Sequence, residues 1–230
     1  GPIYLLDLSG EACQLGGSSY AQTLNRVGEQ APSVVDAGAF ARAFDALQDL
    51  IKKGKIQAGH DISAGGLLTC LLEMCFADND LGVSIDLSAT GEPDLVKRLF
   101  AENAGVVFQA ADGEVEDVLQ AAGVPFYRIG QVTKQAELTI QFGDMTHRFD
   151  VTELRDVWYE TSRQFDRHQT ANGLADVRFA NYKKQPLHYV FPKGFEGRRP
   201  ERLGEGPRIK AAIIREKGSN SEREMAHAMY

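Results

Sequence analysis

The chain has 230 residues, 43% of them hydrophobic and 25% charged, with a formal net charge of −7. This composition is typical of a globular protein with one sizeable core, and the acidic balance argues against nucleic-acid binding as the main function. No apolar run reaches the roughly 20 residues that span a bilayer, and no signal-peptide pattern opens the chain. We therefore expect no nucleic-acid partner, no membrane partner and a cytoplasmic location.

Strands and helices are mixed in the first half of the chain. An apolar run predicts a buried strand over 3–8, and a loop of small residues follows at 15–19. Apolar residues at helical spacing predict a helix over 37–53. A polar cluster at 60–66 then leads into an apolar helix that reaches Phe76.

The next predicted elements complete one domain over residues 1–168. They are strands at 82–87, 105–109, 126–132, 137–142 and 145–150, and helices at 93–103, 113–122 and 152–168. Several connections are of hairpin length, which favours an α+β layered sandwich over a strictly alternating parallel sheet. We expect Glu102 and Asn103 to form a polar turn at a helix end rather than a substrate contact.

The pattern changes after residue 168. Residues 169–208 are rich in Pro, Arg and Lys, which predicts an extended linker, with RNA contact as the less favoured alternative. Residues 210–215 predict a strand, and a Gly-containing loop and a helix starting at Glu222 follow it. We therefore expect 209–230 to be the truncated first βα unit of a doubly wound domain, because a lone unit cannot bury both faces of its strand.

Cys13, Cys70 and Cys75 indicate neither a disulfide framework nor a structural zinc site, because their number is odd and no CxxC occurs. Cys70 and Cys75 lie in an apolar, helix-like segment, where thiols behave as small hydrophobes. A core role is therefore favoured over a catalytic thiol.

The segment His60-Asp61-Ile62-Ser63-Ala64-Gly65-Gly66-Leu67-Leu68 carries the most chemical information. Asp61 and Ser63 lie two residues apart at a strand end, so their side chains point to the same side. A carboxylate suits Mg²⁺, a hydroxyl can donate to phosphate, and Gly65 and Gly66 allow close backbone approach at a helix N-terminus. The competing interpretation is that Asp61 or Ser63 caps the helix. The motif lacks the GK[ST] of a P-loop.

This segment, continued by Leu72–Ala77, resembles formylglycinamide ribonucleotide amidotransferase (phosphoribosylformylglycinamidine synthase) in its large single-chain form. The resemblance continues through Leu15–Ser18, Leu99–Val107, Ile129–Val132, Leu154–Ser162 and Ile214–Glu222. It is collinear over nearly the whole chain. It implies an aminoimidazole-ribonucleotide-synthetase-like C-terminal domain, followed by a linker and the start of a glutaminase domain.

The resemblance also implies a function. The family's purine-biosynthetic ligase converts formylglycinamide ribonucleotide, ATP and glutamine to formylglycinamidine ribonucleotide, ADP, phosphate and glutamate. By this likeness Asp61 is a Mg²⁺ ligand, and Ser63, Gly65 and Gly66 contact ATP or ADP. No catalytic residue falls in this chain. Ala64 stands where relatives often carry an acidic residue.

Two questions stay open at this point. The large form has two pseudo-equivalent nucleotide sites, so the motif belongs either to the reacting site or to an auxiliary one. The remaining synthetase and glutaminase domains would be supplied in cis by the full-length parent, so we expect this piece to be inactive alone. The alternatives are another ATP-using member of the same superfamily, or a non-enzymatic interaction or scaffold domain with a degenerate site.

Overall fold

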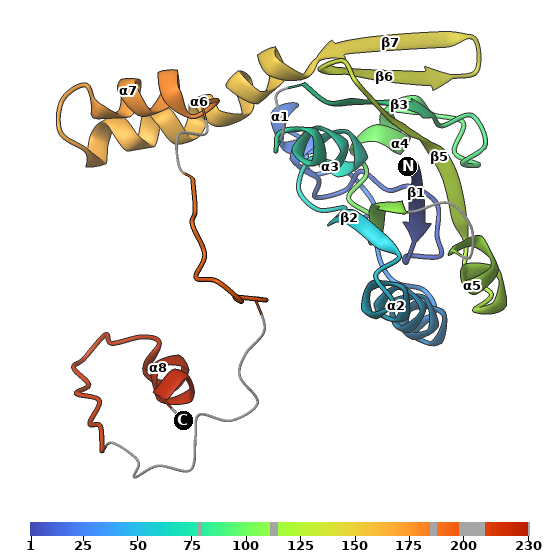
Figure 1. The fold of residues 1–230 in the computed structure, drawn as a ribbon. Coiled ribbons are helices and arrows are strands. Elements are labelled where there is room, and N and C mark those ends of the chain that lie inside the picture. The colour runs from blue at the N-terminus through green and yellow to red at the C-terminus, as the bar shows by residue number, and fades with distance from the viewer. Residues whose placement is uncertain (78–79, 111–114, 185–187, 198–209, 230) are drawn as a thin grey trace. The chain divides into compact units, whose positions relative to one another are not determined.

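A seven-stranded mixed sheet organises the first part of the chain (Figure 1). Its strands are β1 (Pro2–Asp7), β2 (Ile56–Asp61), β3 (Gly82–Asp86), β4 (Gly105–Ala110), β5 (Phe126–Thr133), β6 (Glu137–Phe142) and β7 (Met145–Asp150). They lie in the order β2-β4-β1-β5-β3-β6-β7. Every ladder among these strands is antiparallel except the one between β3 and β6. Strand β2 therefore forms one edge of the sheet.

The computed structural model describes residues 1–77, 80–110, 115–184, 188–197 and 210–229. These residues belong to two units, Gly1–Lys184 and Gln185–Tyr230. In the described parts of the chain, no helix is both long and apolar enough to cross a membrane.

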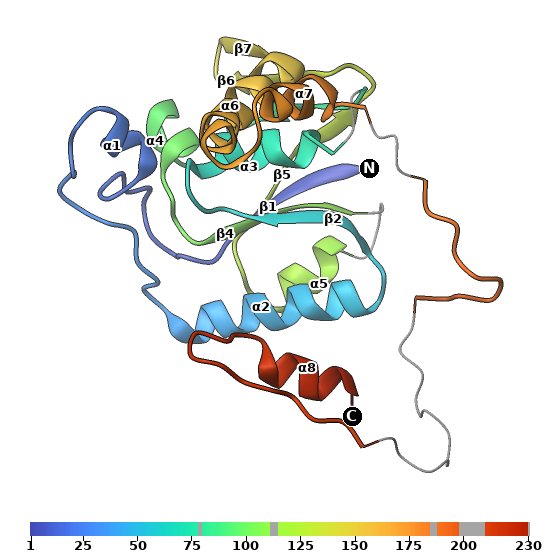
Figure 2. The same cartoon turned by 90° about the vertical axis from the view of Figure 1, so that its left-hand side faces the viewer.

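Helices cover both faces of the sheet (Figure 2). The helices of the first unit are α1 (Ser19–Thr23), α2 (Ala37–Lys52), α3 (Gly66–Cys75), α4 (Leu95–Phe100), α5 (Val115–Ala121), α6 (Val151–Gln169) and α7 (Leu174–Asn181). Side chains alternate along β1, so Ile3 and Leu5 pack with α3 and α4, while Tyr4 and Leu6 pack with α2 and α5. This helix–sheet–helix layering confirms the predicted α+β class.

Aspartates begin three of these helices. The side chain of Asp36 accepts hydrogen bonds from backbone N–H groups of α2, and Asp94 and Asp150 do the same for α4 and α6. Each such cap stabilises a helix by about 1 kcal/mol. These caps fix the helix starts close to where the sequence pattern predicts them.

Helix α4 is shorter than its predicted range of 93–103. Its cap residue Ala101 is already extended, with φ −68° and ψ 135°, so Glu102 and Asn103 lie outside the helix. The predicted helix over 113–122 corresponds to α5, although residues 113 and 114 fall outside the described residues.

The predicted extended linker over 169–208 is wrong in its first part, because Leu174–Asn181 form helix α7. Gly173, with φ 84°, makes the turn that starts this helix. The ring of Tyr182 then stacks on Tyr159 of α6 at a centroid distance of 4.6 Å. The stacking of Tyr182 on Tyr159 therefore closes a helical hairpin within the predicted linker.

The second unit contains helix α8 (Glu222–Met229), as predicted, but residues 210–215 do not form the predicted strand. Ile214 is 94% exposed. A strand needs a neighbour for its backbone N–H and C=O groups, and the described residues of this unit supply none. The strand preference of residues 210–215 is therefore not sufficient to form a strand in this unit. Residue 209 and the linker residues 185–187 and 198–208 lie outside the described parts of the chain.

Candidate functional site

The Asp61-to-Gly66 segment connects edge strand β2 to helix α3. The Asp61 side chain is 74% exposed, and Ser63 is exposed as well. Ile62 between them packs against the core, and its backbone N–H donates to the carbonyl of Gly105 at 2.8 Å. The carboxylate and the hydroxyl are thus accessible, while the residue between them anchors the segment.

Two consecutive glycines make the turn into α3 possible. Gly65 has φ 88° and Gly66 has φ 70°, values that side chains disfavour. A Cβ atom at Gly65 would lie 2.2 Å from Thr69 Oγ1, and one at Gly66 would lie 2.6 Å from the carbonyl oxygen of Leu99. Both positions therefore require glycine, which lets the first turn of α3 approach the end of α4.

The interpretation of Asp61 or Ser63 as a helix cap is wrong. Gly65 occupies the cap position of α3, and no side chain makes a capping hydrogen bond there. The physical reason is the left-handed turn at Gly65, which places the start of α3 at Gly66, three residues after Ser63. Neither side chain is used to begin the helix.

Glu102 joins this turn to the small-residue loop near the N-terminus. Its Oε1 atom accepts hydrogen bonds from the backbone N–H groups of Ser19 at 2.7 Å and Gly65 at 2.8 Å. Burial raises the pKa of Glu102, but these hydrogen bonds outweigh burial and hold the pKa below its usual value. A carboxylate charge therefore sits between the two glycine-containing loops.

Asn103 extends this bridge. Its Oδ1 accepts from the backbone N–H of Gln14 at 3.0 Å, and its Nδ2 donates to Ser9 Oγ at 3.2 Å and to the Ala12 carbonyl at 3.1 Å. Glu102 and Asn103 thus do not form a simple polar turn at a helix end. They order the 9–19 loop. The one sequence signal for this role was a pair of adjacent polar residues at the end of the predicted helix.

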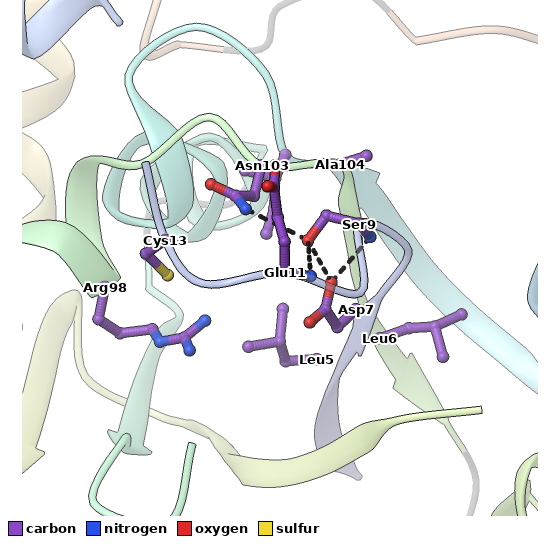
Figure 3. Close-up of a pocket in the computed structure, with 11 residues that line it drawn as sticks. Leu5, Leu6, Asp7, Ser9, Glu11, Cys13, Arg98, Asn103 and Ala104 are labelled. Atoms are coloured by element: carbon purple, nitrogen blue, oxygen red, sulfur yellow. Dashed lines mark hydrogen bonds between the residues drawn. The ribbon is translucent and has the colours of Figure 1, made fainter. Parts of the chain in front are cut away.

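A cavity of about 30 Å³ lies beside this bridge (Figure 3). Asp7, Ser9, Cys13, Arg98 and Asn103 are among the residues that line it. A volume of this size has room for a water molecule or two and excludes a nucleotide. The cavity therefore belongs to the packing of the loop.

The three cysteines are buried and free, which confirms the core role predicted for Cys70 and Cys75. Burial raises the pKa of Cys70 to about 12 and that of Cys75 to about 11, and it also raises the pKa of Cys13. Thiols with raised pKa values are poor nucleophiles near neutral pH. A structural role for all three follows.

A larger groove of about 390 Å³ is lined by residues of α2, β2 and β4, and His60 and Asp61 are among them. Leu47 and Ile51 of α2 and Ile56 of β2 form part of its apolar wall. Small-molecule clefts commonly have volumes of about 300–1,000 Å³. The exposed Asp61 therefore contributes to the lining of a groove of ligand size.

The donors near Asp61 fit one kind of metal binding. Among the residues that the structure describes, no group of three or more His, Cys, Asp or Glu side chains is arranged to hold a metal ion. Mg²⁺ keeps several waters and commonly uses one or two carboxylates together with substrate phosphates. Asp61 therefore fits a Mg²⁺ ion that arrives with a phosphate, but it does not form a metal site by itself.

The mixed sheet is covered by helices, so the protein belongs to the class of α+β domains. The glycine turn after β2, with Asp61 and Ser63 exposed beside it, is its candidate phosphate-binding turn. The family model described as "AIR synthase related protein, C-terminal domain" matches residues 3–143, and the chain belongs to this family.

Named relatives extend this similarity beyond the domain. The chain is 34% identical to human phosphoribosylformylglycinamidine synthase and 32% identical to a probable chloroplastic/mitochondrial form from Arabidopsis thaliana. Both alignments cover 100% of this chain but only 18% and 17% of the relatives, respectively. The resemblance seen in the sequence is therefore confirmed, and the chain spans less than a fifth of these relatives.

Solved structures share the fold. Thermotoga maritima PurL complexed with FGAR has a TM-score of 0.52 at 17% identity, covering 66% of this chain and 27% of that one. The same protein complexed with ATP has a TM-score of 0.51 at 16% identity, covering 66% and 25%. At these identities the comparison establishes the architecture alone.

Proposed function

We propose that this chain forms part of a Mg²⁺-nucleotide site in a phosphoribosylformylglycinamidine synthase. That ligase uses ATP and glutamine to convert formylglycinamide ribonucleotide to formylglycinamidine ribonucleotide. The observation that carries the proposal is collinear identity of 31–34% over 93–100% of the chain to three synthases. The complexes of the related PurL fold with ATP and FGAR support nucleotide and ribonucleotide ligands.

Each residue of the motif has a distinct role in this proposal. Asp61 shares a Mg²⁺ ion with the nucleotide phosphates, and the metal neutralises phosphate charge when bound. Ser63 Oγ donates to a phosphate oxygen. Gly65 and Gly66 let the turn pass close to the phosphates, and we assign them a conformational role because the N–H of Gly65 already donates to Glu102.

These residues bind and orient, and none of them acts as acid, base or nucleophile. In the proposed reaction the amide oxygen of the substrate is phosphorylated by ATP, and ammonia released from glutamine then displaces the phosphate. Positioning and charge neutralisation dominate such transfers. We also propose that further synthetase and glutaminase domains act in the same polypeptide, and that the isolated chain has no turnover.

A thermal-shift titration with ADP, with and without Mg²⁺, tests the proposal. A ligand at a hundred times its Kd stabilises the folded state by about 2.7 kcal/mol. We expect a rise in melting temperature that requires Mg²⁺ and that Asp61→Asn removes. A melting temperature unchanged at millimolar Mg²⁺ and ADP would favour the alternative of a scaffold domain with a degenerate site.

The acidic composition and the absence of a long apolar run in the sequence bear on the partners and the location of the chain. The chain acts without a nucleic-acid or membrane partner, and we propose a cytoplasmic location. The name of the Arabidopsis relative places that protein in chloroplasts or mitochondria. Fractionation of the source cells with an antibody against this chain separates these two locations.

A further inference from the structure

Both carboxylate oxygens of Glu73, on helix α3, have partners. Its Oε2 atom lies 3.2 Å from Nε2 of His60. Its Oε1 atom accepts a hydrogen bond from the indole N–H of Trp158 on α6 at 2.8 Å. The side chain of Glu73 is only 25% exposed and that of His60 32% exposed. This carboxylate therefore links His60, the residue before Asp61, to a helix that begins 91 positions after it, at Val151.

His60 is held at three points. Its ring Nδ1–H donates to the carbonyl oxygen of Asp61 at 2.7 Å, since a carbonyl can only accept. Its own carbonyl oxygen accepts a weak hydrogen bond from the thiol of Cys70 at 3.7 Å. Cys70 and Glu73 lie three positions apart on α3, so they share one face of the helix. One helix face thus fixes both the backbone and the ring of His60.

Asp61 consequently lies between two anchored residues. His60 is fixed on one side, and the N–H of Ile62 bonds to the Gly105 carbonyl on the other. The Asp61 carboxylate itself is 74% exposed, so packing does not hold it. The Oδ1 atom of Asp61 lies 3.6 Å from Nδ1 of His60. The same nitrogen donates to the backbone carbonyl oxygen of Asp61.

Helix α6 holds the far end of this chain of contacts. The guanidinium of Arg155 donates to the Phe76 carbonyl at 2.9 Å, just after α3 ends. The rings of Phe76 and Trp158 lie 5.5 Å apart in a tilted arrangement. These contacts keep Trp158 in place as the donor to Glu73.

We propose that Glu73 is a positioning residue for the Asp61 carboxylate. Glu73 orients the His60 ring, the ring restrains the Asp61 backbone, and Trp158 restrains Glu73. A metal ligand that is held before binding loses less conformational freedom when the ion arrives, and partners behind the ligand typically change metal affinity by about 10–100-fold. This inference rests on the proposed role of Asp61 toward Mg²⁺ and nucleotide.

A purely structural tie between α3 and α6 is the competing role, and it makes a different prediction. A tie supports the fold, so its loss lowers thermal stability and weakens ADP binding equally with and without Mg²⁺. A positioning residue acts through Asp61, so its loss weakens only the part of ADP binding that depends on Mg²⁺.

The test is calorimetric titration of ADP, with and without Mg²⁺, into the full chain and its folded variants. We expect Glu73→Ala to weaken Mg²⁺-dependent ADP binding about tenfold and to leave Mg²⁺-free binding unchanged. Glu73→Gln should lose less affinity than Glu73→Ala, because the amide oxygen still accepts from Trp158 although the negative charge beside His60 Nε2 is gone. Glu153→Ala is the matched control, because Glu153 is an exposed glutamate on α6.

A double-mutant comparison completes the design. In an Asp61→Asn background, Glu73→Ala should cause no further loss, since the carboxylate it positions is absent. Trp158→Phe keeps the ring packing, removes the N–H donor and should give a smaller loss in the same direction. Fluorescence of Trp158, the sole tryptophan, checks that α6 stays packed in the variants other than Trp158→Phe.

The outcomes separate the two proposals. If the unsubstituted chain shows no Mg²⁺-dependent ADP binding, the proposed function fails and the inference fails with it. If Asp61→Asn weakens this binding but Glu73→Ala does not, or if the two losses add in the double variant, the inference alone is overturned.

Discussion

Glu102 shows how one side chain can organise a candidate site. It accepts hydrogen bonds from backbone groups that lie 83 and 37 positions away in the sequence. Hydrogen bonds to a charged group contribute about 1.5–3 kcal/mol each, and an N–H left without its acceptor is destabilising. The two loops therefore depend on this carboxylate for their arrangement.

Replacement of Glu102 should change how stability depends on pH. The pKa of Glu102 is lower in the folded protein than in the unfolded chain, where it is about 4.3. Its contribution is therefore complete above that value and is lost as the pH falls through the folded pKa. We expect Glu102→Gln to be less stable at pH 7 and to lose less stability between pH 5 and pH 3, on the order of 1 kcal/mol less.

Urea unfolding at pH 7, 5, 4 and 3 measures this difference. Glu153→Gln serves as the control, because the exposed side chain of Glu153 lies outside the loop bridge. Parallel pH curves for Glu102→Gln and the unsubstituted chain would contradict the assignment of a stabilising charge to Glu102.

Gly66 should tolerate alanine poorly. Its φ of 70° disfavours any side chain, and the added Cβ atom would lie 2.6 Å from the Leu99 carbonyl oxygen. We expect Gly66→Ala to lower the free energy of unfolding by about 3 kcal/mol. Gly143 has φ 55° with open space around its Cβ position, so Gly143→Ala should lower it by only about 1 kcal/mol. Equal losses in denaturant unfolding would show that the close contact at Gly66 does not matter.

The cysteines should react slowly with thiol reagents in the native protein. Cys70 and Cys75, with pKa values of about 12 and 11, hold almost no thiolate at pH 8. We expect labelling by a disulfide reagent to follow unfolding, with all three thiols reacting at once in concentrated denaturant. Rapid reaction of a cysteine in the native state would identify a local opening near that residue.

At the scale of elements, the α6–α7 hairpin depends on aromatic packing. Tyr159 of α6 lies 4.6 Å from the ring of Tyr182 and 5.9 Å from that of Phe179. Arg163 adds a contact at 4.4 Å over the Phe179 ring. Pairs of this kind contribute about 0.5–1.5 kcal/mol beyond the area they bury.

Removing Tyr159 should therefore release α7 without unfolding the sheet. In Tyr159→Ala we expect faster hydrogen exchange over Leu174–Asn181, while the amides of β1 and β4 keep their protection. Mass spectrometry of peptides from both regions measures the two rates. Val157→Ala is the control, because Val157 is 68% exposed on the same helix. Equal acceleration in both regions would mean that hairpin and sheet unfold as one unit.

Most elements of the first unit, α1 and α7 excepted, were predictable because their signals are local. Strand alternation, helical spacing and capping aspartates such as Asp36 act over a few residues. The strand predicted at 210–215 was wrong because a strand also needs a distant partner. Helix α7 was missed because it is held by ring contacts and ion pairs with α6, such as Arg163–Asp176, which its own sequence does not show.

The candidate site divides in the same way. The spacing of Asp61 and Ser63 and the need for glycine at 65 and 66 are visible in a short window of sequence. The partners of Glu102 and of Glu73 are not visible, since 85 positions separate Glu73 from Trp158 and no periodicity spans such a distance. Helix capping by Asp61 was a sound local interpretation that the double-glycine turn overrides.

At the scale of the whole molecule, the chain spans only 17–18% of the synthases that it resembles along 93–100% of its length. Introducing Asp61→Asn into a full-length parent tests what the motif serves there. If the turnover rate falls by about 100-fold or more, as expected when a charge-stabilising group is lost, the motif serves the reacting nucleotide. If the melting temperature falls while the turnover rate is retained, the motif serves an auxiliary nucleotide.

The central place of β1 in the sheet has a consequence for synthesis. Its neighbours are β4, which starts at Gly105, and β5, which starts at Phe126. Among the strands of this chain, β1 therefore leaves the ribosome first. Its two partners, β4 and β5, are synthesised about a hundred residues later. Four buried residues, Ile3, Tyr4, Leu5 and Leu6, stay unpaired during that interval. Such long-range pairing is slow and exposes apolar strands to aggregation, so the order of synthesis sets when this protein is most vulnerable.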